Sequence, residues 1–306
     1  MKINKLLLSA LLTSNLSLFA NSATSNQSVT TAALLGAKVG LTSVIKLNSS
    51  ELDKLILNSQ KQKLYRNKKI KVHNVDIKLR KILPNNWVGY VFDIDLTANG
   101  RRFVAKDIVF TNGAEITSNI KSLRQGLDYK RLMYPTLDKR YYDKKFLIAG
   151  NENAKHKMVV FSDPLCPICV DVVPGIINKI KNNLKNVSLY YIHMPLKMHP
   201  TATTLVRASI VAKEQGIKDI EYKIYTAEFE NDFDAYREKD QDKVLQIFNK
   251  KFGTSLTMEQ INTKELKKEE ELGLYLSDEA FVNGTPTIFF DGEIDITRSK
   301  YLGYLK

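Results

Sequence analysis

The sequence predicts a chain of two folded parts, a small α+β domain followed by a larger α/β domain. In the region 48–114, a helical pattern precedes three segments in which apolar and polar residues alternate. Over 144–306, short apolar strands alternate with long helical stretches. A chain of 306 residues is long enough to form two separate cores.

The first twenty residues have the pattern of an export signal. Lys2 and Lys5 precede an apolar stretch, and Ala20 ends a plausible cleavage site. An uncleaved membrane anchor is the alternative, but the apolar run is too short to span a bilayer. We therefore expect residues 1–20 to be removed and residues 21–47 to form a leader of uncertain structure, rich in Ser, Thr and Asn.

The region 48–114 predicts one helix and an antiparallel meander. Asn48 offers a cap for a helix over 51–61. The Asn99-Gly100 pair is typical of a tight hairpin turn, because both positions of such a turn need positive φ. Alternating segments predict strands over 70–77, 87–96 and 101–110.

The segment 115–143 is polar, charged and sparsely apolar. Its apolar residues Ile120, Leu123 and Leu127 have helical spacing, so we expect a linker helix here. An exposed linker favours hinge motion between the two domains.

The region 144–306 predicts strands that frame a long helical stretch. Tyr190 and Tyr191 are neighbours in a predicted strand, so we expect one to face the core and the other the surface. About eighty helical residues, 201–280, separate the strands and are too many for an ordinary crossover. The expected elements are strands over 158–161, 187–192, 287–290 and 293–296, a helix over 166–185, helices over 202–214, 220–228, 243–251 and 266–281, and a terminal helix.

Cys166 and Cys169 are the two cysteines of the chain, and they follow an apolar strand directly. Cys166 is expected at the start of a helix, where free N–H groups and the helix dipole favour a thiolate. A thiolate attacks disulfides, and a second cysteine two residues further on can resolve the mixed disulfide. This pattern predicts a redox dithiol that needs no cofactor.

Two other readings of the cysteine pair are weaker. A zinc half-site would need two more ligands, and the candidates His193 and His199 do not match compact zinc spacings, so we expect no metal. A purely structural disulfide would close a very small loop and restrict the unfolded chain little.

Three neighbours are expected to support the dithiol. Pro167 suits a first helical turn, and Ile168 brings no hydrogen-bond donor to the sulfur. We therefore expect a couple less oxidising than that of DsbA and more oxidising than that of thioredoxin. Asp163 is either a proton acceptor near the dithiol or a turn and capping residue. An aspartate directly before a proline, here Pro164, is common in turns, which favours the second role.

Two motifs together resemble a known family. Residues 161–169 read F-x-D-P-x-C-P-x-C, and Thr285-Pro286-Thr287 precedes an apolar strand. They resemble the thioredoxin fold, and within it the DsbC/DsbG class of periplasmic disulfide isomerases. The resemblance implies that the Thr285–Pro286 bond is cis, faces the dithiol and pairs with a substrate strand, and that Pro174 kinks the active-site helix. It also implies a helical insertion at 201–280 and a cystatin-like dimerisation domain at 48–114.

The resemblance implies a periplasmic homodimer that acts on misfolded or reduced exported proteins. An isomerase would be kept reduced by a membrane reductase, whereas a dithiol oxidase would be kept oxidised by a quinone-linked membrane partner. A holdase chaperone with secondary redox activity is a third alternative. The formal charge of +13 comes from lysines scattered along the chain without a basic aromatic cluster, so we expect no nucleic acid partner.

Overall fold

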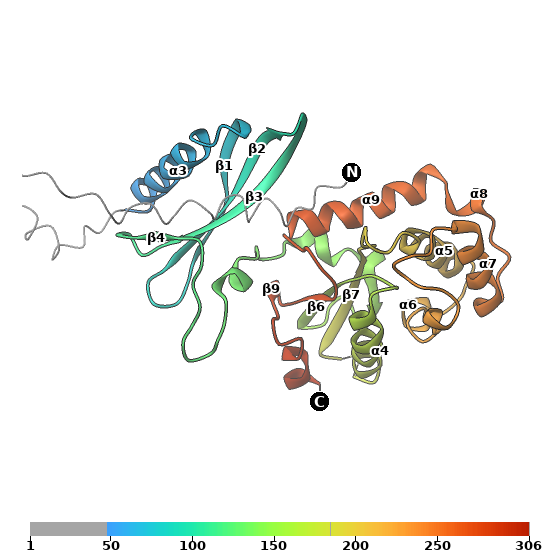
Figure 1. Ribbon diagram of the computed structural model, residues 1–306. Coiled ribbons are helices and arrows are strands. Elements are labelled where there is room, and N and C mark those ends of the chain that lie inside the picture. The colour runs from blue at the N-terminus through green and yellow to red at the C-terminus, as the bar shows by residue number, and fades with distance from the viewer. Residues whose placement is uncertain (1–47, 184, 306) are drawn as a thin grey trace, which may run out of the picture. The chain divides into compact units, whose positions relative to one another are not determined.

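The computed structural model describes residues 48–183 and 185–305, which form two compact units divided between Met133 and Tyr134 (Figure 1). The expected export signal at 1–20 and the leader at 21–47 lie outside the described residues. No helix in the described part of the chain is long and apolar enough to cross a membrane.

The first unit packs one helix on an antiparallel sheet. Asn48 caps the helix through a reciprocal pair of hydrogen bonds with Glu51. The turn at Asn99 and Gly100 has positive φ at both residues, as the sequence predicts. The elements are α3 (Ser49–Tyr65), β1 (Ile70–Ile82), β2 (Val88–Ala98), β3 (Arg101–Thr111) and β4 (Ile116–Thr117), with sheet order β1-β2-β3-β4.

The core of the first unit lies between one face of α3 and the sheet. The buried helix residues Leu52, Ile56 and Leu64 pack against Tyr90 and Phe92 of β2. The helix and the three strands expected in this region are therefore present.

The linker helix predicted over 115–143 is wrong, because this segment contains β4 and two short 3-10 helices but no α-helix. Asp128, Asp138 and Asp143 each accept a hydrogen bond from the backbone N–H two residues ahead. Such local bonds compete with helical hydrogen bonding. Pro135 and a positive φ at Gly126 interrupt the segment further.

The second unit is a five-stranded mixed sheet with helices on both faces, and it confirms the α/β class predicted for the C-terminal part. Strands β6 and β7 are parallel, and the other neighbouring pairs are antiparallel. The sheet order is β5-β7-β6-β8-β9. The strands are β5 (Leu147–Ala149), β6 (His156–Ser162), β7 (Val187–His193), β8 (Thr287–Phe290) and β9 (Glu293–Ile294).

The helical insertion expected over 201–280 is present between β7 and β8. Within it, the α-helix α8 was not predicted, and α6 is shorter than predicted. The expected terminal helix is a 3-10 helix over Lys300–Tyr304. The α-helices of this unit are α4 (Pro167–Lys181), α5 (Ala202–Glu214), α6 (Ile220–Lys223), α7 (Gln241–Phe252), α8 (Met258–Ile261) and α9 (Lys264–Glu279).

Strand β7 is covered on both faces, so the expectation that one of Tyr190 and Tyr191 is exposed is wrong. Tyr190 lies in a cluster with Leu276 of α9. Tyr191 lies in a second cluster with Ile176 of α4 and Leu205 of α5. Alternation still sends the two side chains to opposite faces, but both faces are buried.

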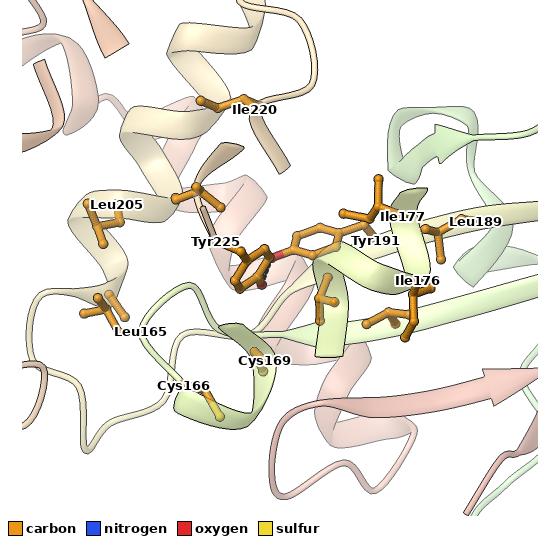
Figure 2. Packing of buried hydrophobic residues seen from close by; sticks show 14 of the residues in the cluster. Leu165, Cys166, Cys169, Ile176, Ile177, Leu189, Tyr191, Leu205, Ile220 and Tyr225 are labelled. Carbon is orange, nitrogen blue, oxygen red and sulfur yellow. Dashed lines mark hydrogen bonds between the residues drawn. The ribbon is translucent and has the colours of Figure 1, made fainter. Parts of the chain in front are cut away.

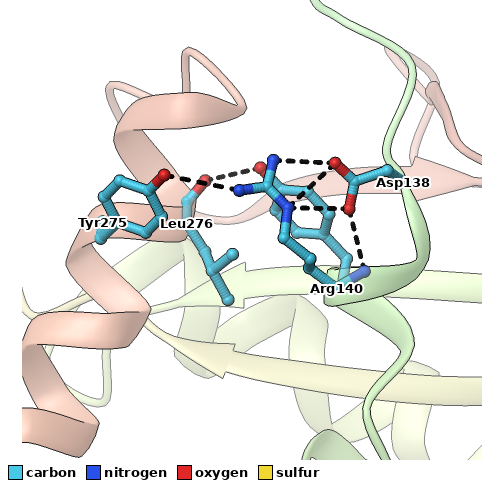
Figure 3. A network of polar contacts seen from close by, with 5 residues as sticks. Asp138, Arg140, Tyr275 and Leu276 are labelled. Atoms are coloured by element: carbon cyan, nitrogen blue, oxygen red, sulfur yellow. Dashed lines mark hydrogen bonds and ion pairs between the residues drawn. The ribbon is translucent and has the colours of Figure 1, made fainter.

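The segment before β5 is attached to α9 by polar contacts (Figure 3). Arg140 forms an ion pair with Asp138 at 2.8 Å and donates a hydrogen bond to the Tyr275 hydroxyl at 3.4 Å. The Tyr141 hydroxyl donates to the Leu276 carbonyl at 3.1 Å. These bonds hold the entry to the second unit against the helix that covers its sheet.

Candidate active site

The dithiol lies where β6 leads into α4. Strand β6 ends at Ser162, and Cys166 is the N-cap of α4 with an extended backbone (φ −76°, ψ 120°). Pro167 occupies the first turn, where its missing N–H costs nothing, and Pro174 lies inside the helix. The sequence therefore places Cys166 at the helix start, as predicted.

Cys166 is set up as a thiolate. The Cys169 thiol, the Thr285 side chain and the backbone N–H groups of Cys169 and Ile168 each favour the thiolate, and together they outweigh burial and lower the pKa of Cys166 to about 5. The two N–H groups belong to the first turn of α4, and that of Cys169 also donates to the Cys166 carbonyl at 2.9 Å. A thiolate at this sulfur is the reactive form in disulfide exchange.

Cys169 has the opposite character. It is fully buried, whereas Cys166 keeps 6% of its surface exposed. Burial, followed by the hydrogen bond to Cys166, raises the pKa of Cys169 far above that of a free thiol. At neutral pH, Cys169 is therefore a thiol that stabilises the neighbouring thiolate.

The structure brings Thr285 and Pro286 to the dithiol. The peptide bond between them is cis, as the sequence resemblance implies. The Cys166 sulfur lies 3.4 Å from the Thr285 carbonyl oxygen and donates a hydrogen bond to it when protonated. The Thr285 hydroxyl is buried and has no conventional hydrogen-bond partner, and its contact with both sulfurs lowers the pKa of each.

Asp163 is a buried structural carboxylate. One oxygen accepts from the Leu165 N–H at 2.7 Å, and the other accepts from the Leu196 N–H at 2.6 Å and from His199 Nδ1 at 2.9 Å. These bonds tie the loop after β7 to the turn that precedes Cys166. Of the two roles considered for Asp163, the geometry matches the turn residue, because its bonds run to the two loops.

A chain of hydroxyl groups lies behind Cys169. The Ser162 hydroxyl is 2.6 Å from the Tyr225 hydroxyl, which is 2.5 Å from the Tyr191 hydroxyl. Figure 2 shows the rings of Tyr191 and Tyr225 meeting at their hydroxyl groups in the cluster that contains both cysteines. Neither the pair Ser162 and Tyr225 nor the bond between His199 and Asp163 was predicted, because each joins residues more than thirty positions apart in the sequence.

The remaining candidates occupy different surroundings. Ile168 is about half exposed beside Cys166, at 49%. His193 packs against the Tyr191 ring at 4.8 Å, and burial lowers its pKa to about 4, so it is neutral at pH 7. His199 bonds Asp163 rather than a sulfur.

Comparison with known proteins supports this fold. A family described as Thioredoxin matches residues 143–304, which is more than half of the chain and includes both cysteines and the cis proline. No curated protein matches the chain.

Solved structures match about half of the chain at low identity. A putative protein-disulfide isomerase from Pseudomonas syringae is 15% identical, with a TM-score of 0.46, over 54% of this chain and 99% of that one. BdbD from Bacillus subtilis is 18% identical, with a TM-score of 0.42, over 55% of this chain and 91% of that one. The thiol-disulfide exchange protein alpha-DsbA2 from Wolbachia pipientis is 16% identical, with a TM-score of 0.40, over 51% and 81%.

Proposed function

Because the chain belongs to the thioredoxin family, we propose that it is a thiol:disulfide interchange protein in which Cys166 attacks and Cys169 resolves. The observation that carries this proposal is the opposite protonation of the two sulfurs. The pKa of Cys166 is lowered to about 5, while the pKa of the buried Cys169 is raised. At neutral pH, Cys166 is therefore a thiolate that can attack, whereas Cys169 remains a thiol until the resolving step.

The exchange begins when the Cys166 thiolate attacks one sulfur of a client disulfide. The client S–S bond breaks, one client sulfur leaves as a thiolate, and a mixed disulfide forms. In isomerisation, a client thiolate then attacks the mixed disulfide and releases the Cys166 thiolate, without net oxidation. In reduction, Cys169 attacks Cys166, and two electrons pass from the dithiol to the client.

We place the protein with the DsbC/DsbG class of periplasmic disulfide isomerases. The pKa of Cys166, about 5, lies between the values of about 7 for thioredoxin and about 3.5 for DsbA. We therefore expect a reduction potential between about −270 mV and about −120 mV, the values of those two proteins. A reduced dithiol in this range needs a membrane reductase as its partner, and its clients are misfolded exported proteins.

Substrate pairing at the cis-proline loop is part of the same proposal. The Thr285 carbonyl and the Cys166 sulfur lie side by side, so an extended client segment paired with the Thr285 backbone would bring its disulfide to the nucleophile. Pro286 has no backbone N–H, so it cannot donate a hydrogen bond to the paired client segment. Exposed Ile168 adds an apolar contact at the edge of this site.

The experiment that tests this function starts from a client protein with scrambled disulfides. The reduced parent should restore client activity, whereas Cys166→Ala should restore none. If Cys166→Ala works as well as the parent, the catalytic proposal fails and a holdase is favoured. If only the oxidised parent acts, and only on reduced clients, the protein is an oxidase and the isomerase assignment is wrong.

Homodimer formation through the first unit is a separate proposal. Strand β1 lies at one edge of the sheet, with Ile82 72% exposed, and edge strands of this kind readily pair between subunits. Sedimentation of the full chain should show a dimer, and Ile82→Lys should weaken it. A parent that sediments as a monomer would refute the proposal.

A further inference from the structure

The exchange just proposed requires Cys169 to become a thiolate inside the core. Cys169 is fully buried, and burial raises its pKa. It attacks Cys166 only after losing its proton. Some group must therefore stabilise a negative charge at a sulfur that water does not reach.

The groups that act most strongly on the Cys169 sulfur in the described chain include no carboxylate and no imidazole. They are the Cys166 sulfur, the Asp163 backbone N–H and the hydroxyls of Ser162 and Thr285, and the last three favour the thiolate. The Asp163 carboxylate is occupied by Leu165, Leu196 and His199. Stabilisation of the thiolate therefore depends on neutral donors.

Among these donors, Ser162 is itself joined to further hydroxyl groups. Its fully buried hydroxyl acts on Cys169 in the sense that favours the thiolate, and it lies 2.6 Å from the Tyr225 hydroxyl. The Tyr225 hydroxyl in turn lies 2.5 Å from the Tyr191 hydroxyl (Figure 2). A hydroxyl that donates to the sulfur can accept from the next hydroxyl, and such chains strengthen each bond by mutual polarisation.

The surroundings keep this chain protonated. Burial raises the pKa of Tyr191 and of Tyr225 well above the usual phenol value, so both remain donors at neutral pH. His193, against the Tyr191 ring, is neutral at pH 7 because burial lowers its pKa to about 4. Glu221 also acts on Tyr191, but it is paired with Lys213.

We propose that Ser162, Tyr225 and Tyr191 form a relay of hydroxyl donors that stabilises the Cys169 thiolate while it resolves the mixed disulfide. Tyr191 donates to Tyr225, Tyr225 to Ser162, and Ser162 to the sulfur. The Cys169–Cys166 bond forms, the bond between Cys166 and the client sulfur breaks, and its electron pair leaves on the client sulfur. The departing client thiolate gains the proton that Cys169 gives up, so no external oxidant or reductant is needed.

The relay predicts that resolution and attack depend on different residues. Ser162→Ala should slow resolution about tenfold, the factor expected for one hydrogen bond to a charged group. Tyr225→Phe should slow it less, and Tyr191→Phe least, because each lies one bond further from the sulfur. Attack by Cys166 should stay within about twofold of the parent rate, because the strongest bonds to its sulfur come from other groups.

The test uses the reduced full chain and an aromatic disulfide, 5,5′-dithiobis(2-nitrobenzoate), under stopped-flow absorbance. The first aryl thiolate is released when Cys166 attacks, and the second when Cys169 resolves the mixed disulfide. Tyr141→Phe is the matched control, because it removes a buried hydroxyl bonded to the Leu276 carbonyl in the cluster on the other face of the sheet. It should change neither phase.

The expected result is a second phase slowed in the order Ser162→Ala, Tyr225→Phe, Tyr191→Phe, with its pH midpoint moved upward and the first phase unchanged. An unchanged second phase, or equal slowing of both phases in all three variants, would overturn the relay and leave the exchange function standing. Because the relay rests on that function, a parent that releases one equivalent without a second phase would overturn both.

Discussion

Cys166 and Cys169 lie about one helical turn apart at the start of α4, yet their surroundings differ. Cys166 lies at the helix start, beside first-turn N–H groups and the Thr285 carbonyl, and keeps some exposed surface. Cys169 lies in the core, beside Ser162 and in a cluster of apolar side chains. Differences in burial and in the hydrogen-bond donors near each sulfur thus give two chemically identical thiols different pKa values.

This difference shows that the surroundings of each cysteine decide which sulfur attacks and which one resolves. Helix N–H donors act on one sulfur, and burial acts on the other. At neutral pH the more acidic and more exposed sulfur, Cys166, attacks first. Cys169 becomes reactive after a mixed disulfide has removed the thiolate beside it.

The largest expected effect comes from removing either sulfur. Cys169→Ala should keep the attack but trap the mixed disulfide with a client, because nothing remains to resolve it. Cys166→Ala should form no mixed disulfide at all, because the remaining thiol is buried. Acid quenching followed by mass analysis distinguishes the two variants. Equal amounts of trapped mixed disulfide in both would contradict the separate roles of Cys166 and Cys169.

The next effect concerns the turn that presents Cys166. Asp163→Ala should cost about 3 kcal/mol in the free energy of unfolding, because it leaves two N–H groups and a buried histidine without an acceptor. Denaturant unfolding measures this loss. Asp163→Asn keeps one acceptor oxygen and should cost less, and a loss under about 1 kcal/mol for Asp163→Ala would show that the turn does not need the carboxylate.

A smaller effect is expected between the two cysteines. Ile168→His should add a donor beside Cys166, lower its pKa further and raise the reduction potential by about 30 mV, a tenfold change in the equilibrium constant. Equilibration with glutathione measures the shift. Ile168→Gln, similar in size but uncharged, is the control, and a histidine variant with an unchanged or lower potential would contradict the electrostatic explanation.

The last expected effect is a dependence of stability on pH. Because the pKa of Cys166 is lowered to about 5, the reduced folded protein holds a thiolate where the unfolded chain holds a thiol. This stabilisation is complete above the unfolded pKa of about 8.5 and is lost as pH falls toward 5. The free energy of unfolding of the reduced parent, relative to Cys166→Ala, should therefore rise from pH 5 to pH 8 in urea titrations, and a flat or falling difference would contradict the lowered pKa.

The sequence predicted what depends on local chemistry. The strand before Cys166, the helix after it and the loop at Pro286 carry their signals within a few residues. The sequence could not place Tyr225 beside Ser162, because the insertion that holds Tyr225 returns to the core through packing that no short motif records. The helix predicted over 115–143 is wrong because three aspartates there accept hydrogen bonds from the backbone N–H groups two residues ahead.

The most direct test of the different sulfurs is the pH dependence of iodoacetamide alkylation, followed for each cysteine by mass analysis. The structure predicts that the labelling of Cys166 rises with a midpoint near pH 5, while Cys169 stays unlabelled through neutral pH. A midpoint for Cys166 near that of a free thiol, about 8.5, or earlier labelling of Cys169, would contradict the assignment of Cys166 as the activated nucleophile.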